Sequence, residues 1–250
     1  MERTKYYFAS DFHLGAPTYD SSRAREKRLV AWLDFIKTDA EAVFLMGDVF
    51  DFWFEYATVI PKGYIRLLGK LAELSDDGVQ LYFFKGNHDM WVFDYFEKEL
   101  NAKIISDELI IEKDGKRLFM HHGDGLGKGD AKYKLLKNFF RSRFCQWLFA
   151  RLHPNFGIGV ANYWSSKSRL ANSKKEGIKH IEKEKNWISK YYEELKTKHG
   201  KFDFIIIGHR HFPSKIGLAD GATYFNLGEW VNYSSYAVLD KGEVSLLEFK

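Results

Sequence analysis

Residues 42–48 read Ala-Val-Phe-Leu-Met-Gly-Asp, a short apolar run that ends at a glycine and a carboxylate. Runs of this length, bounded by Gly and polar residues, are typical of buried β-strands. Four other runs end at side chains that can bind metals: Tyr6–Ser10 before Asp11 and His13, Leu81–Phe84 before Asn87 and His88, Arg117–Met120 before His122, and Phe202–Ile207 before His209 and His211. Because ligands bind at the carboxyl ends of strands in α/β sheets, these five ends are expected to form one site. The pattern predicts a metalloenzyme.

The segments between these runs predict helices outside two packed mixed sheets. Helical spacing of apolar residues or helix-start signals mark the ranges 21–37, 61–74, 90–100 and 177–198. Ser21 or Ser22 is the expected N-cap of the first helix. Asp114-Gly115 between two apolar runs predicts a hairpin, and antiparallel strands are expected at 224–227, 236–239 and 244–249. We expect a single domain over residues 1–250.

From residue 130 to about residue 175 the alternation of strands and helices stops, and a helical cap inserted in the domain is expected. The segment 128–175 holds eleven Lys or Arg residues and one acidic residue, a formal charge of +10. The rest of the chain is therefore acidic, since the total is +4. Aromatic and aliphatic residues recur at helical spacing between the basic ones. The cap is expected to bind an anionic partner.

The one cysteine, Cys145, excludes an internal disulfide and fits a reducing compartment. It has no neighbouring nucleophile motif, which favours a packed residue. No secretory signal is visible at the N-terminus. No apolar run approaches the ~18–20 residues that span a bilayer. We expect a cytoplasmic protein, or one bound peripherally to a membrane from the cytosolic side.

The chemistry of the strand ends favours two divalent ions. Asp11 and His13, like His209 and His211, are one residue apart, and Asp48 can give one oxygen to each of two ions. Oxygen and nitrogen ligands without thiolate suit Mn, Fe(II) or Zn. Two such ions ~3.5–4 Å apart activate water and bind phosphoryl oxygens. Each motif alone has a structural explanation, such as a helix cap or a turn, but the five together favour a metal site.

These motifs resemble those of the calcineurin-like metallophosphoesterases, over residues 11 to 211. The resemblance implies an α/β four-layer sandwich, in which two packed mixed β-sheets are flanked by helices. It also implies two divalent metal ions. One would be held by Asp11, His13, Asp48 and His211, and the other by Asp48, Asn87, His122 and His209. His121 is expected to end its strand, because in the family the ligand directly precedes Gly-Asp.

A narrower resemblance is to the UDP-2,3-diacylglucosamine diphosphatases of lipid A biosynthesis, through residues 10–15, residues 47–53, His122 with Asp130 and Tyr133, and residues 171–174. It implies hydrolysis of UDP-2,3-diacylglucosamine to UMP and 2,3-diacylglucosamine 1-phosphate with Mn²⁺, at the cytosolic face of the inner membrane. The implied catalytic residues are Asp48, Asn87, His88 and His209. The implied substrate-binding residues are Asn87, His88, Asp130, Tyr133, Ser173, Lys179 and His209. Many members have Arg at the position of His88.

Other functions stay open at this point. A metal-dependent phosphodiesterase or nucleotide pyrophosphatase would act on a soluble substrate. A metallophosphoesterase fold can also serve as a binding scaffold, but loss of ligands would be expected there. The basic cap can pack on the body or contact anionic lipids. Nucleic acid is not expected as a partner, since no nucleic-acid motif is present and the remainder is acidic. The oligomeric state is not predicted.

Overall fold

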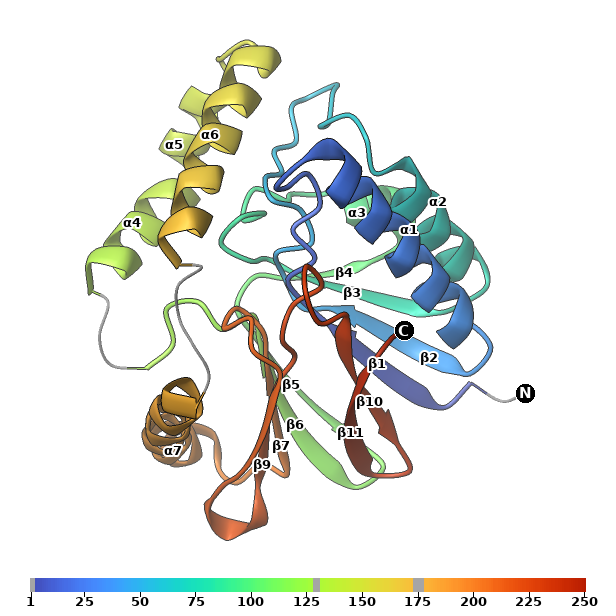
Figure 1. Cartoon of the computed structure of the whole chain (residues 1–250), viewed down its shortest axis with the longest axis vertical. Helices are drawn as coiled ribbons and strands as arrows, with labels where there is room; N and C mark the ends of the chain where they lie inside the picture. Colours follow the sequence, from blue (N-terminus) through green and yellow to red (C-terminus); the bar gives the residue numbers. More distant parts are fainter. Residues whose placement is uncertain (1–2, 128–130, 173–177) are drawn as a thin grey trace.

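The computed structural model describes residues 3–127, 131–172 and 178–250, and it contains two β-sheets (Figure 1). The first sheet has the order β11-β10-β1-β2-β3-β4. Its strands are β1 (Lys5–Ala9), β2 (Ala40–Leu45), β3 (Gln80–Phe84), β4 (Lys103–Ile105), β10 (Ser235–Asp240) and β11 (Glu243–Glu248). The strands from β1 to β4 pair in parallel, whereas β10 and β11 are antiparallel. The carboxyl ends of β1, β2 and β3 therefore lie at one edge.

The second sheet has the order β5-β6-β7-β9-β8. Its strands are β5 (Glu108–Lys113), β6 (Lys116–His121), β7 (Phe204–Ile207), β8 (Ser214–Gly217) and β9 (Thr223–Asn226). The central strands β6, β7 and β9 are parallel, and the edge strands β5 and β8 are antiparallel to them. Asp114 and Gly115 have φ of 53° and 70° in the β5–β6 turn, which confirms the predicted hairpin.

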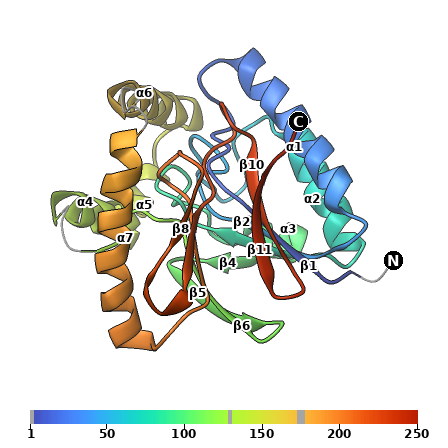
Figure 2. The ribbon, with the colours of Figure 1, turned by 60° about the horizontal axis from the view of Figure 1, so that its bottom comes forward.

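Helices cover the outer face of each sheet, as Figures 1 and 2 show. The first sheet carries α1 (Tyr19–Ile36), α2 (Ile65–Asp76) and α3 (Tyr95–Leu100), and the second carries α7 (Ile178–His199). Three apolar layers hold the elements together. One, with Trp32 and Leu71, lies under α1 and α2; the second, with Phe44 and Met120, lies between the sheets; the third, with Ile188, lies under α7. The expected α/β four-layer sandwich is confirmed.

Several element boundaries differ from the sequence prediction. The expected cap of the first helix is wrong, because Thr18 is the N-cap and Ser21 is its partner in a capping box. The second helix begins at Ile65, after Tyr64 in a left-handed conformation. The third begins only at Tyr95, since the Glu55 carboxylate binds the backbone N–H groups of residues 93–95. The strands β4 and β8 were not predicted, because β4 has only three residues and β8 contains one large apolar residue, Ile216.

The cap consists of α4 (Ala131–Arg141), α5 (Arg143–Phe149) and α6 (Pro154–Asn172), which stand beyond the two sheets in Figure 1. It packs on the loops that follow β2 and β3. The Phe149 ring lies 4.7 Å from the rings of Phe54 and Trp91, between centroids. Trp91 Nε1 donates to the Phe140 carbonyl oxygen at 2.8 Å. The cap is therefore attached to the loops that carry the predicted site.

None of the helices among the described residues is both long enough and apolar enough to cross a bilayer.

Candidate metal centre

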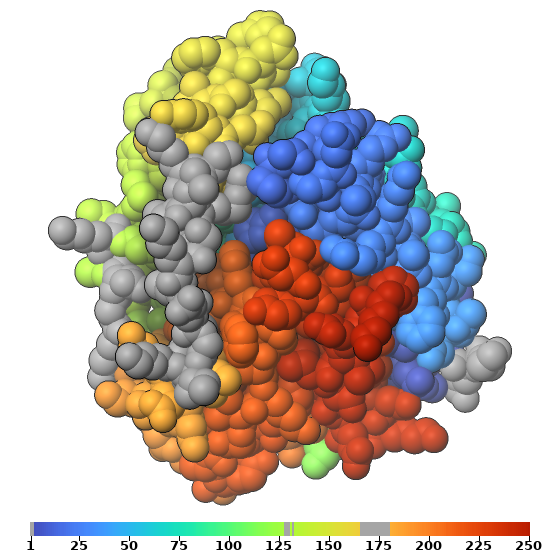
Figure 3. Space-filling model, in the orientation of Figure 1, coloured from blue at the N-terminus to red at the C-terminus, as the bar shows by residue number. Residues whose placement is uncertain are grey.

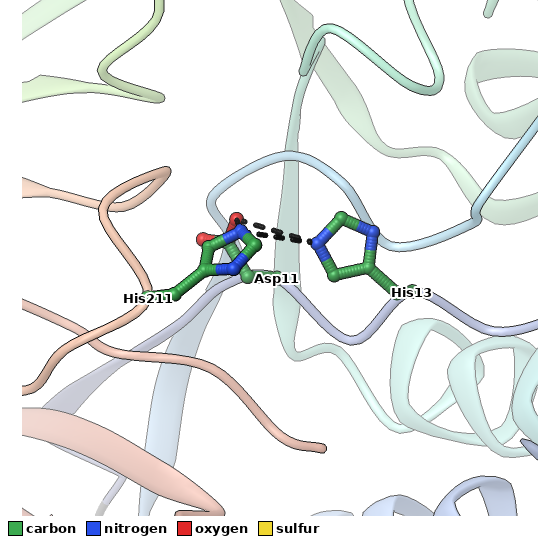
Figure 4. A group of neighbouring side chains, drawn as sticks. All are labelled: Asp11, His13 and His211. Carbon is green, nitrogen blue, oxygen red and sulfur yellow. Dashed lines mark hydrogen bonds and ion pairs between the residues drawn. The ribbon is translucent and has the colours of Figure 1, made fainter. Parts of the chain in front are cut away.

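Three of the predicted metal ligands, Asp11, His13 and His211, point toward one another in Figure 4. Asp11 and His13 follow β1 in the first sheet, and His211 follows β7 in the second. His211 Nε2 lies 3.1 Å from Asp11 Oδ1 and 3.3 Å from His13 Nε2. His13 Nε2 is 3.7 Å from the same carboxylate oxygen. One ion can therefore contact ligands from both sheets.

A second group of ligands, Asp48, His122 and His209, lies beside the first. His122 Nε2 is 3.5 Å from Asp48 Oδ2 and 3.3 Å from Asn87 Oδ1. The same Asp48 oxygen is 3.9 Å from His13 Nε2 in the first group. Asp48 therefore stands between the two groups, where a carboxylate can contact both. The structure brings all seven predicted metal ligands together.

The donor atoms fit divalent ions. Asp11 Oδ1 and Asp48 Oδ2 are buried and have no hydrogen-bond partner in the described chain. The other oxygen of each carboxylate is in use, since Asp11 Oδ2 accepts from His209 N and Asp48 Oδ1 accepts from His88 N, both at 2.8 Å. Buried charged oxygens without a partner are costly. Ligand atoms held at about 2.1 Å from one ion are roughly 3–3.4 Å apart, which is close to the distances found here. Imidazole and carboxylate donors suit the metals predicted from the sequence.

The tautomer of His122 is fixed by its second nitrogen. His122 Nδ1 lies 2.8 Å from the Met46 carbonyl oxygen, which only accepts, so Nδ1 carries the hydrogen. Nε2 is then the nitrogen that faces Asp48 and Asn87. Metal-binding histidines are commonly oriented by such a hydrogen bond to a carbonyl group.

Burial and charge set the protonation of the metal-free site. Burial lowers the pKa of His13 to about 3 and that of His209 to about 4, so both rings are neutral. Burial also opposes the ionisation of Asp48, but the neighbouring His122 and His88 outweigh it and hold the Asp48 pKa well below its ordinary value. Burial lowers the pKa of His122, and the Asp48 carboxylate overcomes this effect and raises it to about 10. A charged His122–Asp48 pair is therefore the resting state without metal.

The backbone of the site is strained. Five of the seven predicted ligands have left-handed φ angles: 56° at Asp11, 44° at His13, 51° at Asp48, 65° at His209 and 61° at His211. This region is uncommon for residues other than Gly, and such residues cluster at functional sites.

The loops also approach one another closely. A Cβ atom on Gly86 would lie 2.2 Å from Asp48 Oδ1, and one on Gly208 would lie 2.2 Å from Ser10 Oγ. Only glycine fits at these two positions.

Two buried residues that were not predicted as ligands or catalytic groups hold these loops. Asp89 accepts from the backbone N–H groups of Gly86 and Val49, both at 2.8 Å, so it ties the loop after β3 to the loop after β2. Burial and the nearby Asp48 raise the pKa of Asp89 to about 7. Arg25 of α1 donates to the carbonyl oxygens of Phe12, His13 and Ala16. The turn-forming sequence around Asp89 indicated that this residue lies in the loop after β3. The spacing of residues in α1 gave no sign that Arg25 contacts the loop after β1.

The predicted substrate-binding residues have different outcomes. His88 lies beside the metal centre, with its ring centroid 4.9 Å from that of His13. Tyr133 of α4 donates to Asp124 Oδ2 at 2.9 Å. Asp124 is two residues after the predicted ligand His122. Asp130 and Ser173 lie outside the described residues, and so does the side chain of Lys179. His121 ends β6, and its Nδ1 accepts from Gly123 N at 2.7 Å.

Comparisons with known proteins identify the family of the chain. The model of the calcineurin-like phosphoesterase family matches residues 4–213. A protein of Porphyromonas gingivalis named UDP-2,3-diacylglucosamine hydrolase is 39% identical over 98% of this chain and 97% of its own length. A protein of the same name from Aeromonas salmonicida is 28% identical, over 96% and 91%. Among solved structures, the phosphoesterase Yfce of E. coli is 14% identical with a TM-score of 0.45, over 99% of this chain and 100% of that one. Because the family model covers most of the chain and a full-length relative exceeds 30% identity, this protein belongs to the calcineurin-like phosphoesterase family.

Proposed function

We propose that this protein hydrolyses the pyrophosphate bond of UDP-2,3-diacylglucosamine and releases UMP and 2,3-diacylglucosamine 1-phosphate. One observation carries the proposal. The 39% identity to a UDP-2,3-diacylglucosamine hydrolase extends over 98% of the chain, so the alignment includes the cap as well as the strand ends. The His and Asp clusters are consistent with the dinuclear site typical of the family. A single domain with an inserted cap would then bring metal chemistry and substrate recognition together.

Two divalent ions, proposed to be Mn²⁺, would supply Lewis acidity and an activated water. Asp11, His13, Asp48 and His211 would hold one ion, and Asp48, Asn87, His122 and His209 the other. The protein itself would provide rigid placement, because both Asp11 and Asp48 have one oxygen fixed by a backbone N–H group. That leaves the second oxygen of each carboxylate for a cation.

Other atoms of the site suit a charged phosphoryl group. The Asn87 side chain and the His209 ring lie next to His122 in the second ligand group. There they would steady the phosphoryl oxygens as negative charge develops. His88 lies at the edge of the same centre and would contact the departing lipid phosphate. Asn87, His88 and His209 are thus proposed to serve both substrate binding and catalysis.

The cap offers an apolar and basic surface to the lipid part of the substrate. Large apolar side chains are exposed on all three of its helices: Leu135, Leu136, Phe139, Phe144, Trp147, Leu148, Phe156, Tyr163 and Trp164. Arg143 and Arg151 are also exposed among them. In Figure 3 the α6 side chains form one end of the molecule. Such helices dip apolar side chains into the headgroup region and hold anionic lipids with basic ones. The protein is therefore proposed to bind peripherally to the cytosolic face of the membrane that carries its substrate.

The test is UMP release from UDP-2,3-diacylglucosamine in detergent by protein reloaded with Mn²⁺. We expect release only with metal, and loss of at least about 100-fold in His13→Ala. His199→Ala is the matched control, since it removes an imidazole far from both ligand groups and should keep full activity. Cleavage of an aryl phosphodiester without any UMP release would overturn the lipid substrate while keeping the metal site.

A further inference from the structure

A third group of titratable side chains lies behind the metal centre and joins it to the cap. Asp51 Oδ1 is 3.6 Å from His13 Nδ1 and 3.6 Å from His88 Nδ1. Ser165 of α6 completes the group, with its Oγ 2.7 Å from Asp51 Oδ2 and 2.9 Å from His88 Nδ1. Asp51 and Ser165 are both buried. The group therefore combines loops after β1, β2 and β3 with a helix of the cap.

The hydrogen bonds determine where the His88 ring carries its hydrogen. The Ser165 hydroxyl has one hydrogen, and it donates this hydrogen to Asp51 Oδ2. Toward His88, Ser165 Oγ can then only accept. The second neighbour of His88 Nδ1 is the Asp51 carbonyl oxygen at 3.0 Å, which also only accepts. Nδ1 must therefore carry the hydrogen, so this nitrogen cannot bind a cation. Although its donors lie close together, the group is not a third metal site.

We infer that Ser165 of the cap is a positioning residue, whose contacts with Asp51 and His88 hold the His88 ring in its Nδ1–H form and leave Nε2 for the phosphate group. Nε2 of His88 has no hydrogen-bond partner within the described part of the chain. The backbone N–H of His88 binds Asp48 at 2.8 Å, which keeps the ring beside the metal centre. The identity of the phosphate group rests on the proposed function. The orientation of the His88 ring rests on the hydrogen bonds alone.

The same carboxylate also lies near a predicted metal ligand. Asp51 Oδ1 faces His13 Nδ1, while His13 Nε2 faces Asp11 and His211. At 3.6 Å this contact is longer than a hydrogen bond, so Asp51 Oδ1 lies beside the imidazoles of His13 and His88 without a hydrogen bond to either ring.

Ser165 makes the cap part of this arrangement. Its helix α6 packs closely on the loop after β2, because a Cβ atom on Gly157 would lie 2.9 Å from Tyr56 Oη. The Phe149 ring of α5 packs on Phe54 of the same loop. A cap that is displaced would take the Ser165 hydroxyl away from both Asp51 and His88. Docking of the cap therefore sets the orientation of His88.

The first test is a double-mutant cycle with turnover of both UDP-2,3-diacylglucosamine and an aryl phosphodiester. Ser165→Ala should lower kcat by roughly 10-fold with little change in KM, and Ser165→Thr should restore most of it. In a His88→Gln background, Ser165→Ala should have no further effect. Ser214→Ala is the matched control: it removes another serine-to-carboxylate hydrogen bond at 8% exposure, against 9% for Ser165, and should leave kcat unchanged. Independent, additive losses in the cycle would overturn the inference.

The second test needs no activity. ¹⁵N spectra of the metal-free protein, with His88 assigned by its loss in His88→Gln, should show a hydrogen on Nδ1. In Ser165→Ala this preference should weaken. A His88 ring with its hydrogen on Nε2 and none on Nδ1 would overturn the inference. If UMP is not released but the spectra and the aryl phosphodiester cycle agree with expectation, the proposed function fails and the positioning role stands.

Discussion

The His122 ring and the Asp48 carboxylate form a buried pair, with His122 Nε2 at 3.5 Å from Asp48 Oδ2. Asp48 raises the pKa of His122 to about 10, against the effect of burial, so the ring is protonated below that pH in the metal-free protein. A metal ion that binds His122 must displace this proton. Affinity for Mn²⁺ should therefore rise by about tenfold per pH unit between about pH 7 and 9. Calorimetry in buffers of different ionisation enthalpy would measure the released proton, and an affinity independent of pH would contradict the pairing.

Asp89 ties the loop after β3 to the loop after β2, and we call this pair of hydrogen bonds the Asp89 clamp. Its loss should lower the free energy of unfolding although no metal ligand is removed. Asp89→Asn replaces one of the two acceptor oxygens by an NH₂ group. The single oxygen that remains cannot accept from both Gly86 N and Val49 N. The free energy of unfolding should fall by about 1–3 kcal/mol, measured by urea titration of the metal-free protein. Asp203→Asn is the control, since Asp203 also accepts from a backbone N–H, that of Arg117, but its side chain is 39% exposed. Equal losses in the two variants would count against the clamp.

Helix α7 is fixed to the second sheet by a buried carboxylate. Glu184 accepts from Tyr224 Oη and Asn226 Nδ2, both at 2.7 Å. Glu184→Ala should lower the free energy of unfolding by about 3 kcal/mol or more, because several buried donors lose their partner. Metal affinity should not change, since this group lies outside the ligand set. A loss of metal binding with unchanged stability would show that the role of Glu184 has been misassigned.

The same hydrogen bonds predict that the stabilisation by Tyr224 is lost at alkaline pH. Burial and the Glu184 carboxylate hold the pKa of Tyr224 well above its ordinary value of 10.0. A folded-state pKa that is raised gives stability that is complete below the unfolded value and is lost as pH rises above it. Tyr224→Phe should therefore be less stable than the wild type at neutral pH, and the difference should shrink above about pH 10. Urea titrations at several pH values would measure it, and a difference that grows with pH would refute the account.

The exposed face of the cap predicts membrane binding. Phe144 and Trp147 are 63% and 52% exposed. Their joint replacement by Ser should lower binding to anionic lipid vesicles by at least about 10-fold, since each large apolar side chain contributes roughly 1.5–3 kcal/mol when fully buried. Hydrolysis of a soluble aryl phosphodiester should remain. Ile65→Ser, at an exposed apolar position on α2, is the control and should bind vesicles as the wild type does. Equal binding by all three proteins would exclude the cap as the contact.

Site residues could be predicted from the sequence where a metal-binding side chain directly follows a predicted strand. Asp48 and His122 each follow an apolar run that is visible in one window of the chain, so their meeting at one edge could be predicted. Ser165 and Asp51 are 114 positions apart, and only the packing of the cap brings them together. Arg25 looks like an ordinary helix position until the loop after β1 folds over it. Contacts of this kind depend on tertiary structure and leave no periodic signal.

Five predicted ligands have a left-handed backbone that the fold itself does not require: Asp11, His13, Asp48, His209 and His211. A left-handed residue other than Gly costs about 1–2 kcal/mol. The metal-free fold should therefore become more stable when such a residue is changed to Gly, even though a ligand is lost. The strain lies in the loops that carry the ligands and not in the sheets, so the ligand loops lower the stability of the metal-free fold.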